Sequence, residues 1–335
     1  MDDLDPPKPP ESRFRLPPDF HEPPQILHVR REPLPAEQII EQYKPKRYRI
    51  STRLWLISLA LFIATCASTF YAGGSFFGHE AEFDKNLGLQ FMVGLMGILL
   101  AHELGHFTAS LFYRIPATPP IFIPMPYVSL FGTMGALIIQ QHGVSDRKSQ
   151  FDIGIAGPLA GLVIAIPLCL YALDQSQLAP MVESRYDAER LFDFYAFEYP
   201  PIMKWMIHYI YPEIPAGMHV EWTPLLFACW TGFLITALNL VPIGQLDGGH
   251  ILYGLIGRWS YPVAVGLVAL AIGYMVASQS YAYMLMLIII STVGIRHPPT
   301  ANDRVPLGWF RIALGWLTLA FLMISFTPNP IEMAF

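Results

Sequence analysis

The chain has 335 residues, of which 53% are hydrophobic and only 14% are charged, and its formal net charge is -5. Soluble domains carry roughly 25% charged residues, so this composition excludes an ordinary soluble enzyme and indicates a polytopic membrane protein. The sequence has no long run of basic residues, and nucleic-acid binding is therefore not expected.

The first 50 residues differ in composition from the rest of the chain. They contain 11 of the 31 prolines, together with nine basic and nine acidic residues. Such a segment buries too little apolar surface to order itself. We therefore expect residues 1–50 to form a proline-rich, mostly disordered cytoplasmic tail, and residues 51–335 to form the membrane domain. The acidic start also lacks the basic region and apolar core of a signal peptide.

Seven apolar segments follow the tail, and they predict an all-α protein with about seven transmembrane helices. They cover residues 54–73, 88–112, 151–173, 223–243, 262–278, 281–295 and 309–327. The sixth segment is the weakest of these predictions, because only Gln279 and Ser280 separate it from the fifth.

The charges of the connections predict how the segments are oriented. Basic residues surround the start of the first segment and place the N-terminus in the cytoplasm: Lys44, Lys46, Arg47, Arg49 and Arg53. The connection 174–222 carries eight acidic and three basic residues, which places it outside. With seven spans, cytoplasmic and external connections alternate without a conflict, and the C-terminus lies outside.

Two connections are unlike ordinary loops. Residues 117–140 are apolar but rich in proline and glycine, so they cannot form a regular membrane helix. We expect a short hairpin there that re-enters the membrane while shielded by protein. The connection 174–222 is rich in aromatic residues, which is typical of helices lying at the outer membrane interface.

The second segment contains His102-Glu103-Leu104-Gly105-His106, the HExxH pattern. On a helix, positions four apart share a face, so both imidazoles can bind one metal ion. Glu103, about 100° around the helix from His102, can reach a water at the open metal position and act as general base. The motif follows a charge-free run, where ionisable residues are costly and usually functional.

Zinc needs a third protein ligand, and the best candidate is Asp247. It belongs to the stretch 239–250, NLVPIGQLDGGH, at the end of the fourth segment. Pro242 breaks the helix, and the glycines after Asp247 permit a tight turn. Asp247 is therefore expected on irregular backbone, at a depth similar to that of the HExxH motif. A surface turn or helix-cap role is the alternative.

Together, the motifs at 102–106 and 239–250 resemble the site-2 protease family of intramembrane zinc metalloproteases, over about residues 50–325. The stretch 154–161, GIAGPLAG, is similar to the glycine-proline motif of that family's middle core segment, although tight helix packing is an alternative role. The connection 296–308 is similar to that of the branch without a PDZ domain. This branch includes bacterial and plastid members, and we expect a bacterial cytoplasmic (inner) membrane.

The resemblance implies a zinc-dependent intramembrane endopeptidase. Its substrates would be single-span membrane proteins within the lipid bilayer, cleaved within or near their transmembrane segments. A three-helix catalytic core within about residues 88–250 would hold one Zn²⁺ ion through His102, His106 and Asp247. Glu103 would be the general base. The sequence indicates no oligomeric state.

Two polar residues next to the aspartate have open roles. By the resemblance, Asn239 orients the scissile carbonyl or its oxyanion, and the alternative is an interhelical hydrogen bond. His250 either supports the metal site or lies at the membrane interface.

The sequence argues against two other classes of protein. A transporter with an intramembrane ion path would show paired repeats and charges along several spans, and the sequence shows neither. An inactive binding scaffold would normally lack Glu103 or a ligand, and this chain keeps all four residues.

The remaining histidines and the cysteines need no metal. The cysteines sit in apolar runs without a CxxC pair, as packing residues do; they are Cys66, Cys169 and Cys229. The histidines are expected to be solvated, outside for His79, His208 and His219 and inside for His142 and His297.

Overall fold

The structure is a computed structural model, and it describes residues 50–78, 82–141, 143–180, 195–279, 283–284, 287–288, 290 and 294–333. All of them belong to the second of two units into which the chain divides, Tyr48–Phe335. Apart from Ile50, the predicted tail over residues 1–50 lies outside the described residues.

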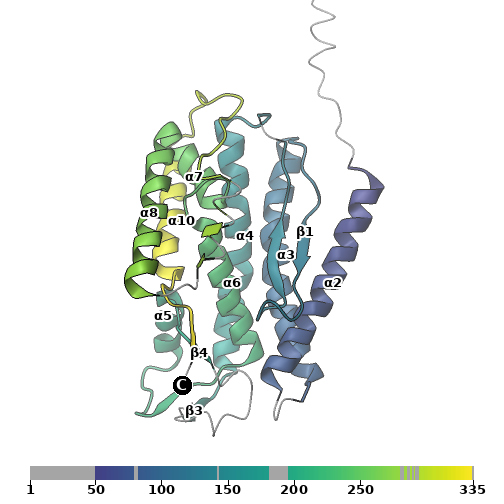
Figure 1. Ribbon diagram of the computed structural model, residues 1–335, viewed down its shortest axis with the longest axis vertical. Helices are drawn as coiled ribbons and strands as arrows, with labels where there is room; N and C mark the ends of the chain where they lie inside the picture. The colour runs from purple at the N-terminus through teal and green to yellow at the C-terminus, as the bar shows by residue number, and fades with distance from the viewer. Residues whose placement is uncertain are drawn as a thin grey trace, which may run out of the picture. The chain divides into compact units, whose positions relative to one another are not determined.

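Three long helices pack side by side, with α3 (Lys85–Phe112) between α2 (Thr52–Phe77) and α4 (Arg147–Asp174) (Figure 1). An aspartate caps the start of both α3 and α4. The Asp84 carboxylate accepts the backbone N–H groups of Asn86 and Leu87 at the start of α3, and the Asp146 carboxylate accepts that of Ser149 in α4. These caps satisfy donors that would otherwise be unpaired at the helix ends.

The remaining helices cover the other side of α4. They are α5 (Pro201–Ile210), α6 (Pro224–Leu240), α7 (Asp247–Ile256), the 3₁₀ turn η4 (Gly257–Trp259), α8 (Ser260–Ser278) and α10 (Trp309–Ser325). The break between α6 and α7 follows Leu240, because Pro242 cannot continue the helical hydrogen bonds.

Residues 117–140 form a hairpin instead of a helix, as their prolines require. Strand β1 (Ile121–Pro124) pairs antiparallel with β2 (Thr133–Leu137). Two serines of α2 hold the hairpin, since the Ser58 hydroxyl donates to the Pro120 carbonyl (2.5 Å) and the Ser68 hydroxyl donates to Gly132 (2.6 Å). The hairpin is therefore confirmed as local structure, and its entry into a membrane stays a prediction.

Two further strand pairs tie distant segments together. They join β3 (Leu178–Pro180) to β5 (Met218–Val220) and β4 (Tyr195–Phe197) to β6 (Ile331–Met333). The first pair lies within the connection between α4 and α6, and the second joins this connection to the C-terminal end of the described chain.

Within the described residues, four helical stretches are long and apolar enough to cross a membrane. They are Thr52–Phe77, Lys85–Phe112, Arg147–Asp174 and Asp247–Ser278, and α6 and α10 are shorter apolar helices. The chain is thus a mostly helical membrane protein. The count of seven spans stays a prediction, since much of the sixth segment, 281–295, lies outside the described residues.

The main apolar core lies where α2, α3, α4 and α6 meet. Phe227 and Trp230 of α6 are fully buried there and stack on each other, with ring centroids 5.4 Å apart. Cys169 and Cys229 are buried in the same core as packing residues. A closely packed bundle of this kind holds the polar residues of α3 in fixed positions.

Candidate metal centre

Helix α3 carries the HExxH motif into the protein interior. His102, Glu103 and His106 are only 3%, 4% and 8% exposed. The helix is continuous through the motif, so the two histidines lie one turn apart on the same face, as predicted. Three ionisable side chains buried together among apolar helices are costly unless they have partners.

Asp247, which is 145 residues from His102 in the sequence, is the acidic partner of the two histidines. The prediction of irregular backbone at this residue is wrong, because Asp247 is the first residue of α7. The turn at 241–246 places it there, with Gly244 in the left-handed region (φ +56°). A Cβ on Gly248 would lie 1.9 Å from the Leu240 carbonyl, so only glycine lets α7 start so close to the end of α6.

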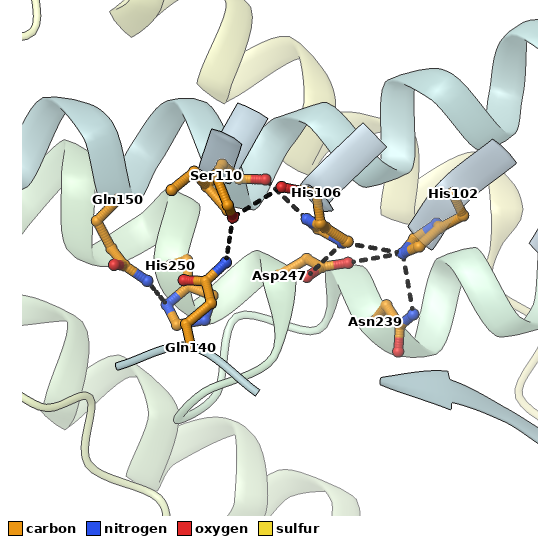
Figure 2. Close-up of polar contacts among 9 residues, drawn as sticks. His102, His106, Ser110, Gln140, Gln150, Asn239, Asp247 and His250 are labelled. Atoms are coloured by element: carbon orange, nitrogen blue, oxygen red, sulfur yellow. Dashed lines mark hydrogen bonds and ion pairs between the residues drawn. The ribbon is translucent and has the colours of Figure 1, made fainter. Parts of the chain in front are cut away.

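The three side chains point at one another (Figure 2). His102 Nε2 lies 3.1 Å from Asp247 Oδ2, and His106 Nε2 lies 3.2 Å from Asp247 Oδ1. The two Nε2 atoms are 3.2 Å apart. One nitrogen or oxygen of each residue lies within 4.8 Å of the others, the geometry of a group able to hold a metal ion.

This donor set fits zinc. Two ligand atoms bound at about 2.0–2.1 Å to a tetrahedral zinc ion lie about 3.3 Å apart, close to the observed separations. Two imidazoles and a carboxylate are ligands that zinc prefers, and three protein ligands leave a fourth position open for water.

The orientation of His106 is set by α4. Its Nδ1 lies 2.7 Å from the carbonyl oxygen of Ile153. A carbonyl only accepts, so Nδ1 carries the proton and donates, and Nε2 keeps its lone pair toward Asp247 and His102. Ile153 was not anticipated from the sequence, because its contribution is a backbone atom.

The glycines of the 154–161 stretch make room for both imidazoles. A Cβ on Gly157 would lie 2.0 Å from His106 Nε2, and one on Gly161 would lie 3.3 Å from the His102 ring. Close helix packing also occurs, since a Cβ on Gly105 of α3 would lie 2.4 Å from the Ala156 carbonyl. The motif therefore serves the site as well as the packing.

The two other predicted site residues lie beside this cluster. Asn239 of α6 has its amide nitrogen 3.4 Å from His102 Nε2. Glu103 has electrostatic interactions with His102, His106 and Asp247. The structure therefore brings together all five residues singled out in the sequence, with Asn239 at the edge.

A second group of polar residues adjoins α7, and the sequence pattern predicts only part of it, a role for His250 near the site. His250 Nδ1 lies 2.9 Å from Gln150 Nε2 and 2.7 Å from His297 Nε2. The prediction of a solvated His297 is wrong. It is 7% exposed and stacks on Tyr253, with ring centroids 4.2 Å apart, because the connection after residue 294 folds back over α7.

The other histidines are less closely involved. His208 is exposed, as predicted, and His219 is half-buried in β5. His79 and His142 lie outside the described residues.

Comparison with known proteins identifies a family that fits this site. Residues 90–279 match peptidase family M50, a range that contains all five site residues. The chain is 29% identical over 245 residues to the probable zinc metalloprotease EGY1, chloroplastic, of Arabidopsis thaliana, which covers 72% of this chain and 43% of the relative.

Two rice proteins match in the same way. The chain is 27% identical over 254 residues to EGY1 of Oryza sativa subsp. japonica, which covers 72% of this chain and 41% of the relative. It is 24% identical over 286 residues to EGY3 of Oryza sativa subsp. indica, which covers 82% of this chain and 48% of the relative. Both are named as probable zinc metalloproteases of the chloroplast. The chain spans less than half the length of these relatives.

Proposed function

Since this chain belongs to peptidase family M50, we propose that it is a zinc-dependent endopeptidase that cleaves single-span membrane proteins within or near their transmembrane segments. The observation that carries this proposal is the convergence of His102, His106 and Asp247 with Glu103 buried among apolar helices. The named relatives are probable zinc metalloproteases, which supports the same assignment.

His102 and His106 would hold the zinc ion through Nε2, and Asp247 through a carboxylate oxygen. When bound, zinc polarises the substrate carbonyl and activates a water molecule. The hydrogen bond from His106 Nδ1 to Ile153 keeps that imidazole in the ligating tautomer, so the site is preorganised by the fold.

Glu103 is the residue we assign to proton transfer. Its carboxylate takes a proton from the attacking water and delivers it to the leaving nitrogen of the cleaved peptide bond. The side chain is buried next to the ligands, on the turn of α3 that carries His102. Asn239 is proposed to donate its amide N–H to the scissile carbonyl oxygen, since this amide lies next to His102 Nε2.

A helical substrate hides its carbonyls in hydrogen bonds and must unwind before cleavage. We assign this task to the hairpin. Strand β1 packs on α2, while β2 (Thr133–Leu137) pairs with β1 alone among the described strands. Its second edge offers backbone donors and acceptors to an extended substrate segment. The prediction of a membrane-re-entrant hairpin belongs to this proposal.

The proposed topology has seven spans with the N-terminus in the cytoplasm. The basic residues at the ends of α2 and α4 support it. The predicted location is the bacterial cytoplasmic membrane, whereas the relatives named above are chloroplastic plant proteins. An integral membrane location is common to both.

The test is cleavage of a panel of single-span peptides by purified protein in detergent, with bound zinc quantified in each sample. Wild type would be compared with Glu103→Gln and Asp247→Asn. We expect cleavage to be lost in both variants and zinc to fall mainly in Asp247→Asn. Full cleavage by Glu103→Gln would overturn the general-base assignment, and a zinc-free active wild type would overturn the proposed function.

A further inference from the structure

A pocket with a strongly basic lining lies where α7 gives way to α8. Its volume is about 340 Å³, and its lining consists of Tyr253, Arg258, Ser260, Tyr261, Arg296, His297 and Pro299. They come from α7, η4, α8 and the connection before α10, so the pocket depends on the tertiary fold. We call it the basic pocket.

The lining of the basic pocket carries positive charge without a carboxylate. Arg258 and Arg296 are both exposed. Within the part of the chain that the structure describes, neither guanidinium has an acidic partner within ion-pair distance. Asp303, which contacts Tyr253 at this pocket, accepts hydrogen bonds from the Tyr253 and Thr300 hydroxyl groups. Two unpaired guanidinium groups facing one cavity favour a doubly coordinated anion such as phosphate.

The inner wall of the basic pocket is rigid. Tyr253 and His297 are buried and stacked on each other, and the hydroxyl-bearing Ser260 is buried at the start of α8. His297 is held in turn by His250 of α7. A buried wall of aromatic and hydroxyl groups next to two exposed arginines is suited to an anionic group that enters from the surface.

Exposed aromatic residues lie at the same end of the helices as the basic pocket. Trp259 and Tyr261 follow α7, and Trp309 and Phe310 begin α10 at the same end of the helices (Figure 1). Tryptophan and tyrosine at helix ends are typical of the membrane–water interface. A basic pocket at that depth meets the headgroups of anionic lipids.

We propose that the basic pocket binds the phosphate group of an anionic phospholipid headgroup through Arg258 and Arg296. The lipid source is favoured over a soluble phosphate compound because the start of the apolar helix α8 lines the pocket, and the aromatic residues named above lie at the same end of the helices. Occupancy would anchor the end of α7 opposite Asp247. The proposal concerns lipid binding and stands whether or not the chain is a protease.

The test uses the purified full-length protein in a zwitterionic detergent. It is titrated with short-chain phosphatidylglycerol, short-chain phosphatidylcholine or glycerol 3-phosphate, and adducts are measured by native mass spectrometry. The variant Arg258→Gln/Arg296→Gln removes the two guanidinium groups. The control Lys148→Gln/Arg304→Gln removes two basic residues from the same end of the molecule, outside the pocket.

We expect phosphatidylglycerol affinity to fall about tenfold or more in Arg258→Gln/Arg296→Gln and to stay within about twofold of wild type in the control. Phosphatidylcholine should bind more weakly than phosphatidylglycerol to wild type. Equal phosphatidylglycerol binding by both double variants would overturn the site. Binding of glycerol 3-phosphate in place of phosphatidylglycerol would overturn the lipid source.

Arg258, Arg296 and Arg304 are exposed and Lys148 is partly exposed, so both double variants should fold. Melting of each lipid-free protein checks this. The expected increase in melting temperature on adding phosphatidylglycerol should be present in wild type and the control and absent in Arg258→Gln/Arg296→Gln. A shift of equal size in all three proteins would also contradict the proposal.

Discussion

Gly157 of α4 lies against the imidazole of His106 on α3, so closely that a Cβ on Gly157 would be 2.0 Å from Nε2. The ring cannot turn away without cost, because its Nδ1 donates a hydrogen bond to Ile153 of the same helix α4. Helix α4 thus both orients the His106 imidazole, through Ile153, and leaves room for the ring, through Gly157. The position of His106 Nε2 is therefore sensitive to an added methyl group at position 157 of α4.

Gly157→Ala should damage the metal centre without unfolding the protein. The added methyl group would push the His106 ring from its position, and we expect zinc affinity to fall by about 10- to 100-fold. Zinc would be measured by competition with a chelating dye. The control is Gly97→Ala on α3, where a Cβ would meet nothing within 4 Å. Equal zinc affinity in the two variants would show that the ring accommodates the methyl group.

Glu103→Gln should separate catalysis from metal binding. The amide keeps the size of the carboxylate but cannot accept the proton, so we expect peptide cleavage to fall by about 100- to 10,000-fold. Zinc content should stay at the wild-type level. Glu82→Gln, an exposed position before α3, serves as the control and should cleave normally. A loss of zinc in Glu103→Gln would point to a structural role instead.

Asp247→Asn should weaken zinc retention more than any change at Glu103. The substitution removes the negative charge that contacts both imidazoles at 3.1 and 3.2 Å. We expect zinc to be lost during purification and cleavage to be lost with it. Wild type stripped with a chelator should regain cleavage when zinc is added, whereas Asp247→Asn should not. The exposed Asp174→Asn provides the charge-matched control.

The two serines of α2 should contribute to the stability of the hairpin. Each hydroxyl donates to a buried carbonyl, at Pro120 for Ser58 and at Gly132 for Ser68. Ser58→Ala removes the hydroxyl donor to the Pro120 carbonyl, and we expect a loss of about 1 kcal/mol in the free energy of unfolding. Ser68→Ala should cost less, because the Gly132 carbonyl still accepts the backbone N–H of Met125.

Limited proteolysis within residues 117–140 would report the same change locally, as faster cleavage in Ser58→Ala and Ser68→Ala. The matched control is Ser278→Ala on the exposed surface of α8, whose hydroxyl donates to Tyr274 in its own helix. Unchanged proteolysis in both α2 variants would mean that strand pairing alone holds the hairpin.

The local parts of the site could be predicted from the sequence because they depend on short-range periodicity. His102 and His106 are four residues apart, so any helix places them on one face, and the apolar runs around them leave little choice but a helix. The prolines of 117–140 excluded a helix there in the same way, and the structure has a hairpin. Asp247 could be predicted from its motif, although the irregular backbone predicted there is the start of helix α7.

Contacts between segments about 40 or more residues apart could not be predicted in this way, because no local pattern encodes which faces meet. The carbonyl of Ile153 behind His106, the space left by Gly157 and the burial of His297 beside His250 all depend on how α3, α4, α7 and the last connection pack. The basic pocket has the same origin. By itself, the sequence determined the residue types and helical faces that bind a metal; only the tertiary structure decided how these faces close around it, because close packing between helices sets each ring and carbonyl to within a fraction of an ångström.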